Sequence, residues 1–246
     1  MVQISAHQGG TEYARPATYE AYTHALASGA EFAELDIRRT KDDVLVVHHD
    51  ARPGRTGPRI ADLAYGDLCD RLGYPVPRVT DVMGMLAGKL TGHLDLKEIG
   101  YEEEVIDLAL ASFGPGNFIA TTLEDISVKT IKRSFPAVTT ALSLGRDLKG
   151  IPRNRWVAVR RSELYPLDRL RSCGADWVAV NHRLGRLRVI SACWRQGIGV
   201  MVWTVDADGL IDRFVADRRI AVLITNRPEH AARRRARLAG NASGSA

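Results

Sequence analysis

The sequence predicts a single α/β domain folded as a closed (β/α)8 TIM barrel. Short apolar runs that alternate as β-strands do are separated by segments whose apolar residues recur at helical spacing. Counted from Val2, eight such strands occur within a chain of 246 residues, which is the usual size of a closed barrel. No glycine motif that could cradle a nucleotide phosphate follows any strand, which argues against an open nucleotide-binding sheet.

The first half of the chain contains three of the expected strands, at residues 2–6, 32–38 and 89–96. A helix is expected over 18–28, where Gly29 provides a stop, and another over 81–87, where Thr80 provides an N-cap. Between them, a polar turn leads into a short extra strand at 44–47. The stretch 51–78 is rich in proline and glycine, so it is expected to leave the regular alternation.

The second half of the chain repeats one unit of helix and strand. The remaining strands are expected at residues 117–120, 138–142, 177–180, 199–203 and 222–225. The helices are expected at residues 102–112, 124–134, 166–173, 186–196 and 207–217. We expect the barrel to occupy residues 1–238 and the small, polar tail at 239–246 to be disordered.

Composition excludes several classes of protein. With 45% hydrophobic and 26% charged residues, the chain can bury a large core. It has no apolar run of roughly eighteen residues and no signal-peptide start, so we expect a cytoplasmic protein without stable membrane insertion. The net charge is +5, but the basic residues are spread out apart from a cluster at 233–237, so we expect no nucleic-acid partner. The mild positive charge suits an anionic small-molecule substrate, whereas the oligomeric state stays open.

Two acidic residues on one strand are the first candidate site. Glu34 and Asp36 are two positions apart, so they point to the same side of the strand. The next extended run ends in His48, His49 and Asp50, which brings imidazole to the same region. Two buried carboxylates need a positive charge between them, and a hard divalent cation provides it. The alternative is a solvated face of an edge strand, with His49 closing a turn.

Further polar residues stand at the C-terminal ends of other expected strands, where barrels of this kind carry their chemistry. Asp95 and Lys97 repeat the two-residue spacing, although a plain salt bridge would explain them as well. His7 follows the first strand, where a turn residue is the alternative. Trp203 and Asn226 end the last two strands. Three carboxylates, including Asp95, favour Mg²⁺ or Ca²⁺ over zinc.

The motifs resemble those of the glycerophosphodiester phosphodiesterase family along nearly the whole chain. They begin with His7-Gln8-Gly9 for its H-R-G and continue with GAEFAELDIRRTKDDVLVVHHD for its long pattern G-A-D-x-x-E-x-D-x-x-x-T-x-D-x-x-x-V-x-H-D. They go on with PVPRVTDVM for I-P-T-L-E-E-V, LDLK for E-x-K, VMVWTVD for W-T-V and ITNRPE for T-D-x-P. The resemblance implies a metal-dependent phosphodiesterase whose small-molecule substrate is a glycerophosphodiester or a related small alkyl phosphodiester, which it cleaves to an alcohol and a phosphomonoester.

The resemblance also implies a role for each matching residue. His7 and His49 would serve as acid and base. One divalent metal, Mg²⁺ or Ca²⁺, would be held by Glu34, Asp36 and Asp95. The remaining matched positions would contact the substrate or its phosphate, namely Lys97, Trp203, Gln8 and Asn226. Neighbouring residues of a strand point in opposite directions, so only one of His48 and His49 can face the site. The family's H-D dipeptide matches His49-Asp50, so His49 is expected to face the site and His48 to face away.

The departures from the family pattern leave two other functions open. Gln8 replaces an arginine, and residues 15–18 read R-P-A-T instead of P-E-N-T, so an acid and an amide are missing. Asp95 replaces glutamate and Asn226 replaces aspartate, as in the related spider-toxin phospholipases D, which form cyclic phosphates. A lysophospholipase D or cyclising lyase is therefore one alternative, although the cysteine-bridged loop of those toxins is absent. A degenerate barrel that only binds phosphate is the other.

Overall fold

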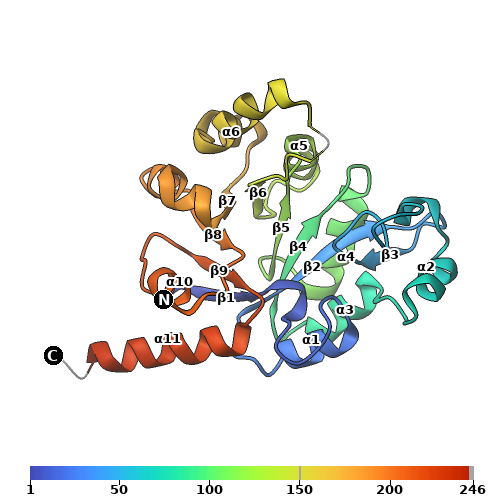
Figure 1. The fold of residues 1–246 in the computed structure, drawn as a ribbon, viewed down its shortest axis with the longest axis horizontal. Helices are drawn as coiled ribbons and strands as arrows, with labels where there is room; N and C mark the ends of the chain where they lie inside the picture. Colours follow the sequence, from blue (N-terminus) through green and yellow to red (C-terminus); the bar gives the residue numbers. More distant parts are fainter. Residues whose placement is uncertain (150, 244–246) are drawn as a thin grey trace.

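The computed structural model, in which residues 1–149 and 151–243 are described, is a closed barrel of eight parallel strands (Figure 1). The first strand, β1, pairs with β2 on one side and with the last strand, β9, on the other, and this closes the sheet. The barrel strands are β1 (Gln3–Ala6), β2 (Phe32–Arg39), β4 (Thr91–Leu96), β5 (Phe118–Thr122), β6 (Thr140–Leu144), β7 (Trp177–Asn181), β8 (Gly199–Trp203) and β9 (Val222–Thr225). The predicted (β/α)8 fold is confirmed.

Helices surround the strands on the outside. The α-helices are α1 (Tyr19–Ala25), α2 (Tyr65–Leu72), α3 (Val79–Leu86), α4 (Glu102–Phe113), α5 (Asp125–Ser134), α6 (Trp156–Leu164), α7 (Leu167–Cys173), α8 (His182–Leu184), α9 (Ile190–Trp194), α10 (Asp208–Val215) and α11 (Pro228–Ser243). Short 3₁₀ turns occur at η1 (His7–Gly9), η2 (Ile60–Asp62) and η3 (Arg153–Arg155), and one π turn at η4 (Gly185–Val189). Within the described ranges, no helix combines the length and apolar character needed to cross a bilayer.

A ninth strand, β3 (Leu45–Val47), lies outside the barrel. It runs antiparallel to β2, with Arg38 opposite Val46, and its backbone continues into His48 and His49. Because β2 has a second partner along its C-terminal half, it is eight residues long, whereas the other barrel strands have four to six. This hairpin carries His49 back toward the mouth of the barrel.

Apolar side chains form two layers, one inside the barrel and one between the strands and the helices. The outer layer is the larger one and includes the fully buried side chains of Ile4, Leu35 and Leu94. Inside the barrel, Phe32, Met201 and Val222 form a smaller cluster, on which the ring of Trp177 packs. Phe32 and Val222 begin their strands and Met201 is in the middle of its strand, so the apolar interior fills the N-terminal part of the barrel and leaves the C-terminal end for polar groups.

Several boundaries differ from the sequence prediction. The strand expected at 138–142 lies at Thr140–Leu144, because its pairing with β5 and β7, rather than its apolar start, fixes where it begins. Helix α3 begins at Val79, so Thr80 is inside the first turn and is not the N-cap. The excursion at 51–78 contains α2, and the region before Pro166 contains α6, neither of which was predicted.

The C-terminal tail also departs from the prediction for five of its residues. Helix α11 continues to Ser243, so residues 239–243 are helical rather than disordered, and residues 244–246 lie outside the described residues. Adding a residue to an existing helix costs far less than starting one, and the segment contains alanine, the best helix former. The polar composition of the tail was therefore outweighed by the helix that precedes it.

Candidate active site

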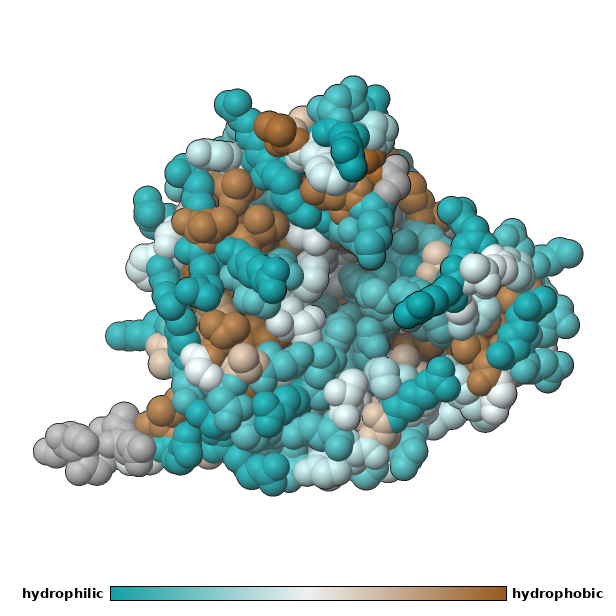
Figure 2. Space-filling view, viewed as in Figure 1, coloured by the Kyte–Doolittle hydropathy of each residue, from teal (hydrophilic) through white to brown (hydrophobic). Residues whose placement is uncertain are grey.

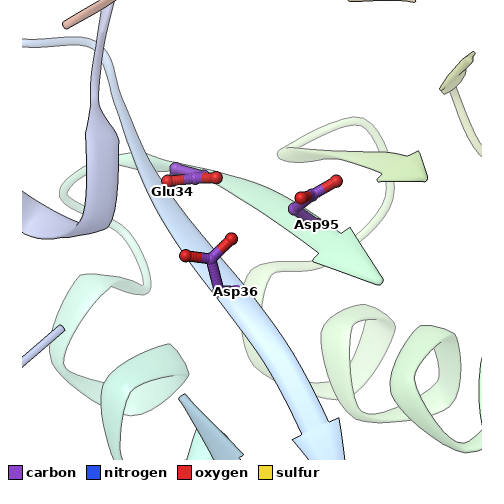
Figure 3. A group of neighbouring side chains, drawn as sticks. All are labelled: Glu34, Asp36 and Asp95. Atoms are coloured by element: carbon purple, nitrogen blue, oxygen red, sulfur yellow. The ribbon is translucent and has the colours of Figure 1, made fainter. Parts of the chain in front are cut away.

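The three carboxylates predicted to hold a cation lie together at one end of the barrel. β2 and β4 pair in parallel register with Asp36 opposite Asp95, and Glu34 lies two residues earlier on the same side of β2 (Figure 3). One carboxylate oxygen from each of the three lies within 4.8 Å of the others. Glu34 and Asp36 are buried, whereas Asp95 is partly exposed.

Lys97 compensates part of this negative charge. Its Nζ lies 2.6 Å from Asp36 Oδ1 and also contacts Asp95 Oδ2. Burial alone would raise the pKa of Asp36, but Lys97, His49 and His7 outweigh it and hold that pKa at about 2. Burial, with the neighbouring charge of Asp36, raises the pKa of Glu34 well above its usual value. The positive charge of Lys97 is therefore not enough to stabilise the ionised form of all three carboxylates.

A divalent cation fits the charge and the donors of this cluster. Three carboxylates against one ammonium group leave two negative charges uncompensated. Both oxygens of Asp36 are buried, and among the described residues neither has a hydrogen-bond partner of good geometry, although Lys97 is near. Buried oxygens without partners are costly unless a further group binds them. Oxygen-only donors are the ligands that Mg²⁺ and Ca²⁺ prefer.

His7 is held beside the carboxylates by a defined set of bonds. The 3₁₀ turn after β1 places Gln8 in the left-handed region, with φ of 53°, and Gln8 N donates to Glu34 Oε2 at 2.8 Å. His7 Nε2 then lies 3.7 Å from the same carboxylate oxygen, and burial lowers the pKa of His7. The neutral imidazole is thereby favoured, as a general base requires.

The other ring nitrogen of His7 is fixed by the opposite end of the chain. Its Nδ1 lies 2.7 Å from Asn226 Oδ1, while Asn226 Nδ2 donates to Asp206 Oδ2 at 2.8 Å. Because Asp206 accepts from the amide nitrogen, the amide oxygen must face His7 and accept a proton from Nδ1. In the neutral ring the free lone pair is then on Nε2, the nitrogen that faces the carboxylates.

His49 reaches the site from the hairpin outside the barrel. Arg38 donates from Nε and Nη2 to the carbonyl oxygen of His49, at 3.1 and 2.7 Å, and anchors the end of β3. The His49 side chain is 53% exposed, and its Nδ1 lies 2.9 Å from Asp50 Oδ1. His49 lines the same cavity as His7, whereas His48 is not among the lining residues and directs Nδ1 to the carbonyl of Asp50.

The cavity has a volume of about 410 Å³ and opens at the C-terminal ends of the strands (Figure 2). Its polar lining includes three histidines, His7, His49 and His93, with Glu34, Asp95 and Lys97. The lining also includes Trp203, Leu123, Arg146 from the loop after β6 and Arg160 from α6. A polar reaction centre thus adjoins a mixed pocket large enough for a small organic group.

The residues expected to bind substrate are placed unequally. Trp203 lines the cavity, and Lys97 lies at the carboxylates. Gln8 contributes its backbone N–H to Glu34, and its side chain is not among the lining groups. The amide of Asn226 bonds His7 and Asp206, so the structure gives it a contact that orients the histidine.

Sequence reasoning missed four residues that support this site, namely Arg38, His93, Thr121 and Asp206. Two of them carried a usable signal, because His93 stands two positions before Asp95 and Arg38 two after Asp36, on the same strand faces. His93 is buried, and burial lowers its pKa to about 4. Thr121 and Asp206 gained their roles only through partners on other strands.

A barrel with its polar residues at the C-terminal strand ends belongs to the class of (β/α)8 proteins that carry catalytic groups at this face. Within that class, the chain belongs to the glycerophosphoryl diester phosphodiesterase family, whose model matches residues 7–230. The family expected from the sequence motifs is confirmed.

Individual relatives agree with this assignment. YhdW of Bacillus subtilis, named provisionally as a glycerophosphodiester phosphodiesterase, is 28% identical over 225 residues, which cover 82% of this chain and 86% of YhdW. A glycerophosphodiester phosphodiesterase structure from Parabacteroides distasonis superimposes with a TM-score of 0.76 at 19% identity, covering 97% of this chain and 98% of its own. The Oleispira antarctica phosphodiesterase OLEI02445, solved with the product sn-glycerol-3-phosphate, has a TM-score of 0.74 at 16% identity and covers 94% of this chain and 96% of its own. At such identities the structural matches establish the fold.

Proposed function

We propose that this protein is a metal-dependent phosphodiesterase that hydrolyses glycerophosphodiesters, or a related small alkyl phosphodiester, to an alcohol and a phosphomonoester. The observation that carries the proposal is that His7 and His49 line one cavity together with Glu34 and Asp95, two members of the group of three carboxylates that Asp36 completes. Such a set supplies both a cation site and two groups for proton transfer. A phosphate-binding protein would need neither. We place the protein in the cytoplasm, acting on free phosphodiesters.

The substrate phosphate would lie between the cation site and the histidines. When bound, Mg²⁺ or Ca²⁺ supplies positive charge to the phosphate oxygens, and the residues that would hold it are Glu34, Asp36 and Asp95. Lys97 adds a second positive charge to the same wall and keeps Asp36 ionised. Both groups favour the transition state, because negative charge accumulates on the oxygens of phosphorus as the nucleophile arrives.

The two histidines would divide the proton transfers. The lone pair at His7 Nε2 can take a proton from the attacking oxygen, since Asn226 fixes Nδ1 as the protonated nitrogen. His49, in its protonated form, can give a proton to the leaving alkoxide, and the contact of its Nδ1 with Asp50 Oδ1 at 2.9 Å orients the ring. The P–O bond to the attacking oxygen forms as the P–O bond to the alcohol breaks.

³¹P NMR of the purified protein with Mg²⁺, or Ca²⁺, and a panel of glycerophosphodiesters and lysophospholipids tests this function directly. We expect the diester resonance to be replaced by that of a phosphomonoester. A persistent cyclic phosphate would identify a cyclising lyase instead. No change with any substrate or ion would leave a barrel that only binds phosphate and would overturn the proposal.

Exchanging the side chains of Asp206 and Asn226 is expected to move the pH profile. The double variant Asp206→Asn/Asn226→Asp keeps the hydrogen-bond pattern but puts a carboxylate directly on His7 Nδ1. An adjacent negative charge favours the imidazolium and raises the pKa of His7, opposing the effect of burial. The acidic limb of kcat/KM should therefore shift to higher pH, by about 1 unit or more. An unmoved limb would mean that His7 is not the group titrating there.

A further inference from the structure

A third histidine of the cavity takes no part in the proposed proton transfers. His93, on β4, is 2% exposed. Its Nδ1 lies 3.0 Å from Ser5 Oγ, and its Nε2 lies 3.2 Å from Thr121 Oγ1. The Thr121 hydroxyl in turn donates to Asp95 Oδ1 at 2.7 Å. Four residues from three strands, β1, β4 and β5, thus form one chain of hydrogen bonds that ends on a carboxylate of the proposed cation site.

The acceptor-only carboxylate at one end determines which atom is the donor in each hydrogen bond of this series. The Asp95 carboxylate only accepts, so the proton of the Thr121 hydroxyl is directed to it. Thr121 Oγ1 must then accept from His93, which places the ring proton on Nε2. Nδ1 is left with its lone pair and accepts from the hydroxyl of Ser5. In the opposite tautomer, with the ring proton on Nδ1, Nε2 would be an acceptor. It would then compete with Asp95 for the single hydroxyl proton of Thr121.

In this arrangement every buried polar side-chain atom of Ser5, His93 and Thr121 has a hydrogen-bond partner. Apart from the two Asp36 oxygens, the described residues contain only one buried side-chain polar atom without a partner, Nδ1 of His182, so Ser5, His93 and Thr121 are satisfied. Asp95 is held at both oxygens, with Thr121 on Oδ1 and Lys97 on Oδ2. Its carboxylate plane is therefore set before any cation arrives.

We propose that His93 is a positioning residue for the cation site, which acts through Thr121 to fix the orientation of the Asp95 carboxylate. This inference rests on the proposed function, because it assigns Asp95 to the metal. Thr121 Oγ1 has a second acceptor within reach, the carbonyl oxygen of Leu94 at 3.5 Å. The N–H of His93 occupies a lone pair of Thr121 and keeps the hydroxyl proton directed to Asp95. Without that N–H the hydroxyl is free to turn to Leu94 and release Oδ1.

Calorimetric titration of the metal-free protein with MgCl₂ or CaCl₂ tests the inference without using activity. His93→Leu and Thr121→Val should each weaken cation binding by about 10-fold to 100-fold, the usual effect of losing a group that orients a metal ligand. His93→Gln keeps an N–H for Thr121 and should stay near the parent. The double variant His93→Leu/Thr121→Val should bind the cation no more weakly than Thr121→Val alone, because His93 acts through Thr121.

Ser127→Ala is the matched control. Its hydroxyl is also fully buried and donates to a buried carboxylate, Glu102 Oε1, at 2.5 Å, but that pair lies outside the cavity. This variant loses an equivalent bond and should bind the cation as the parent does. Circular dichroism identifies any variant that fails to fold, and Thr121→Val preserves shape if His93→Leu does not fold.

Three results would overturn the inference. If folded Thr121→Val or His93→Leu binds the cation as tightly as the parent does, the hydrogen bonds through Thr121 do not orient Asp95. Equal weakening in His93→Gln would show that His93 acts through its shape and not through its N–H. If the parent itself binds neither ion, the proposed metal function fails and this inference with it, a result distinguished by the parent titration alone.

Discussion

Replacing His7 or His49 by alanine is expected to lower kcat by about 10²-fold to 10⁴-fold, the range for removal of a positioned acid or base. His7→Ala removes the lone pair that faces the carboxylates, and His49→Ala removes the group on the hairpin side of the cavity. Steady-state kinetics with a glycerophosphodiester at saturating Mg²⁺ gives the comparison. Thermal unfolding should show a folded protein in both cases, because neither ring belongs to the apolar core.

His48→Ala provides the matched control for the hairpin. It removes a neighbouring imidazole whose Nδ1 is bonded to the carbonyl of Asp50 and which does not line the cavity. We expect it to retain most of the parent kcat. If His48→Ala abolishes turnover while His49→Ala does not, the assignment of the catalytic ring at this strand end is wrong.

Removing the cation is expected to have an effect of similar size. Treatment with EDTA should reduce the rate by about 10³-fold or more, because the cation supplies several kcal/mol of charge stabilisation in the transition state. Adding back Mg²⁺ or Ca²⁺ should restore it. Asp36→Asn should reproduce the loss without recovery, since Asp36 is the fully buried carboxylate of the three, and among the described residues only the Lys97 ion pair compensates its charge.

The same cation should stabilise the folded protein. At a free concentration one hundred times its Kd, a ligand specific for the native state adds about 2.7 kcal/mol to the free energy of unfolding. For a chain of this size that is a rise in Tm of roughly 5–10 °C. Asp36→Asn should lose this rise, whereas Glu102→Gln, at a buried carboxylate that is not one of the three, should keep it. A rise in Tm that persists in Asp36→Asn would place the cation elsewhere.

Sequence periodicity was sufficient for the barrel and for part of the site. Alternation along a strand placed Glu34 and Asp36 on one side, and the barrel rule placed Asp95 at the same end. The sequence pattern could not predict the register in which Asp36 lies opposite Asp95, because the pairing of parallel strands is set by packing across the whole sheet.

The supporting contacts were beyond the sequence for a different reason. Asp206 orients Asn226 across twenty positions, and Thr121 reaches Asp95 across twenty-six. A polar residue at a strand end can serve a turn, a salt bridge or a site, and only its neighbours in space decide which. Helix α6 was missed because its Arg-rich sequence lacks a clear apolar stripe, although it contributes Arg160 to the cavity.

The bond between His7 and Asn226 spans 219 positions, from the first barrel strand to the residue after the last. A protein is synthesised from its N-terminus, so a nascent chain contains all three carboxylates and both histidines long before Asn226 is made. Until β9 arrives and pairs with β1, the tautomer of His7 has nothing to fix it. Ribosome-bound or C-terminally truncated chains that lack Asn226 should therefore show no phosphodiester turnover. The onset of turnover would indicate that the last strand has been translated and that the barrel has closed.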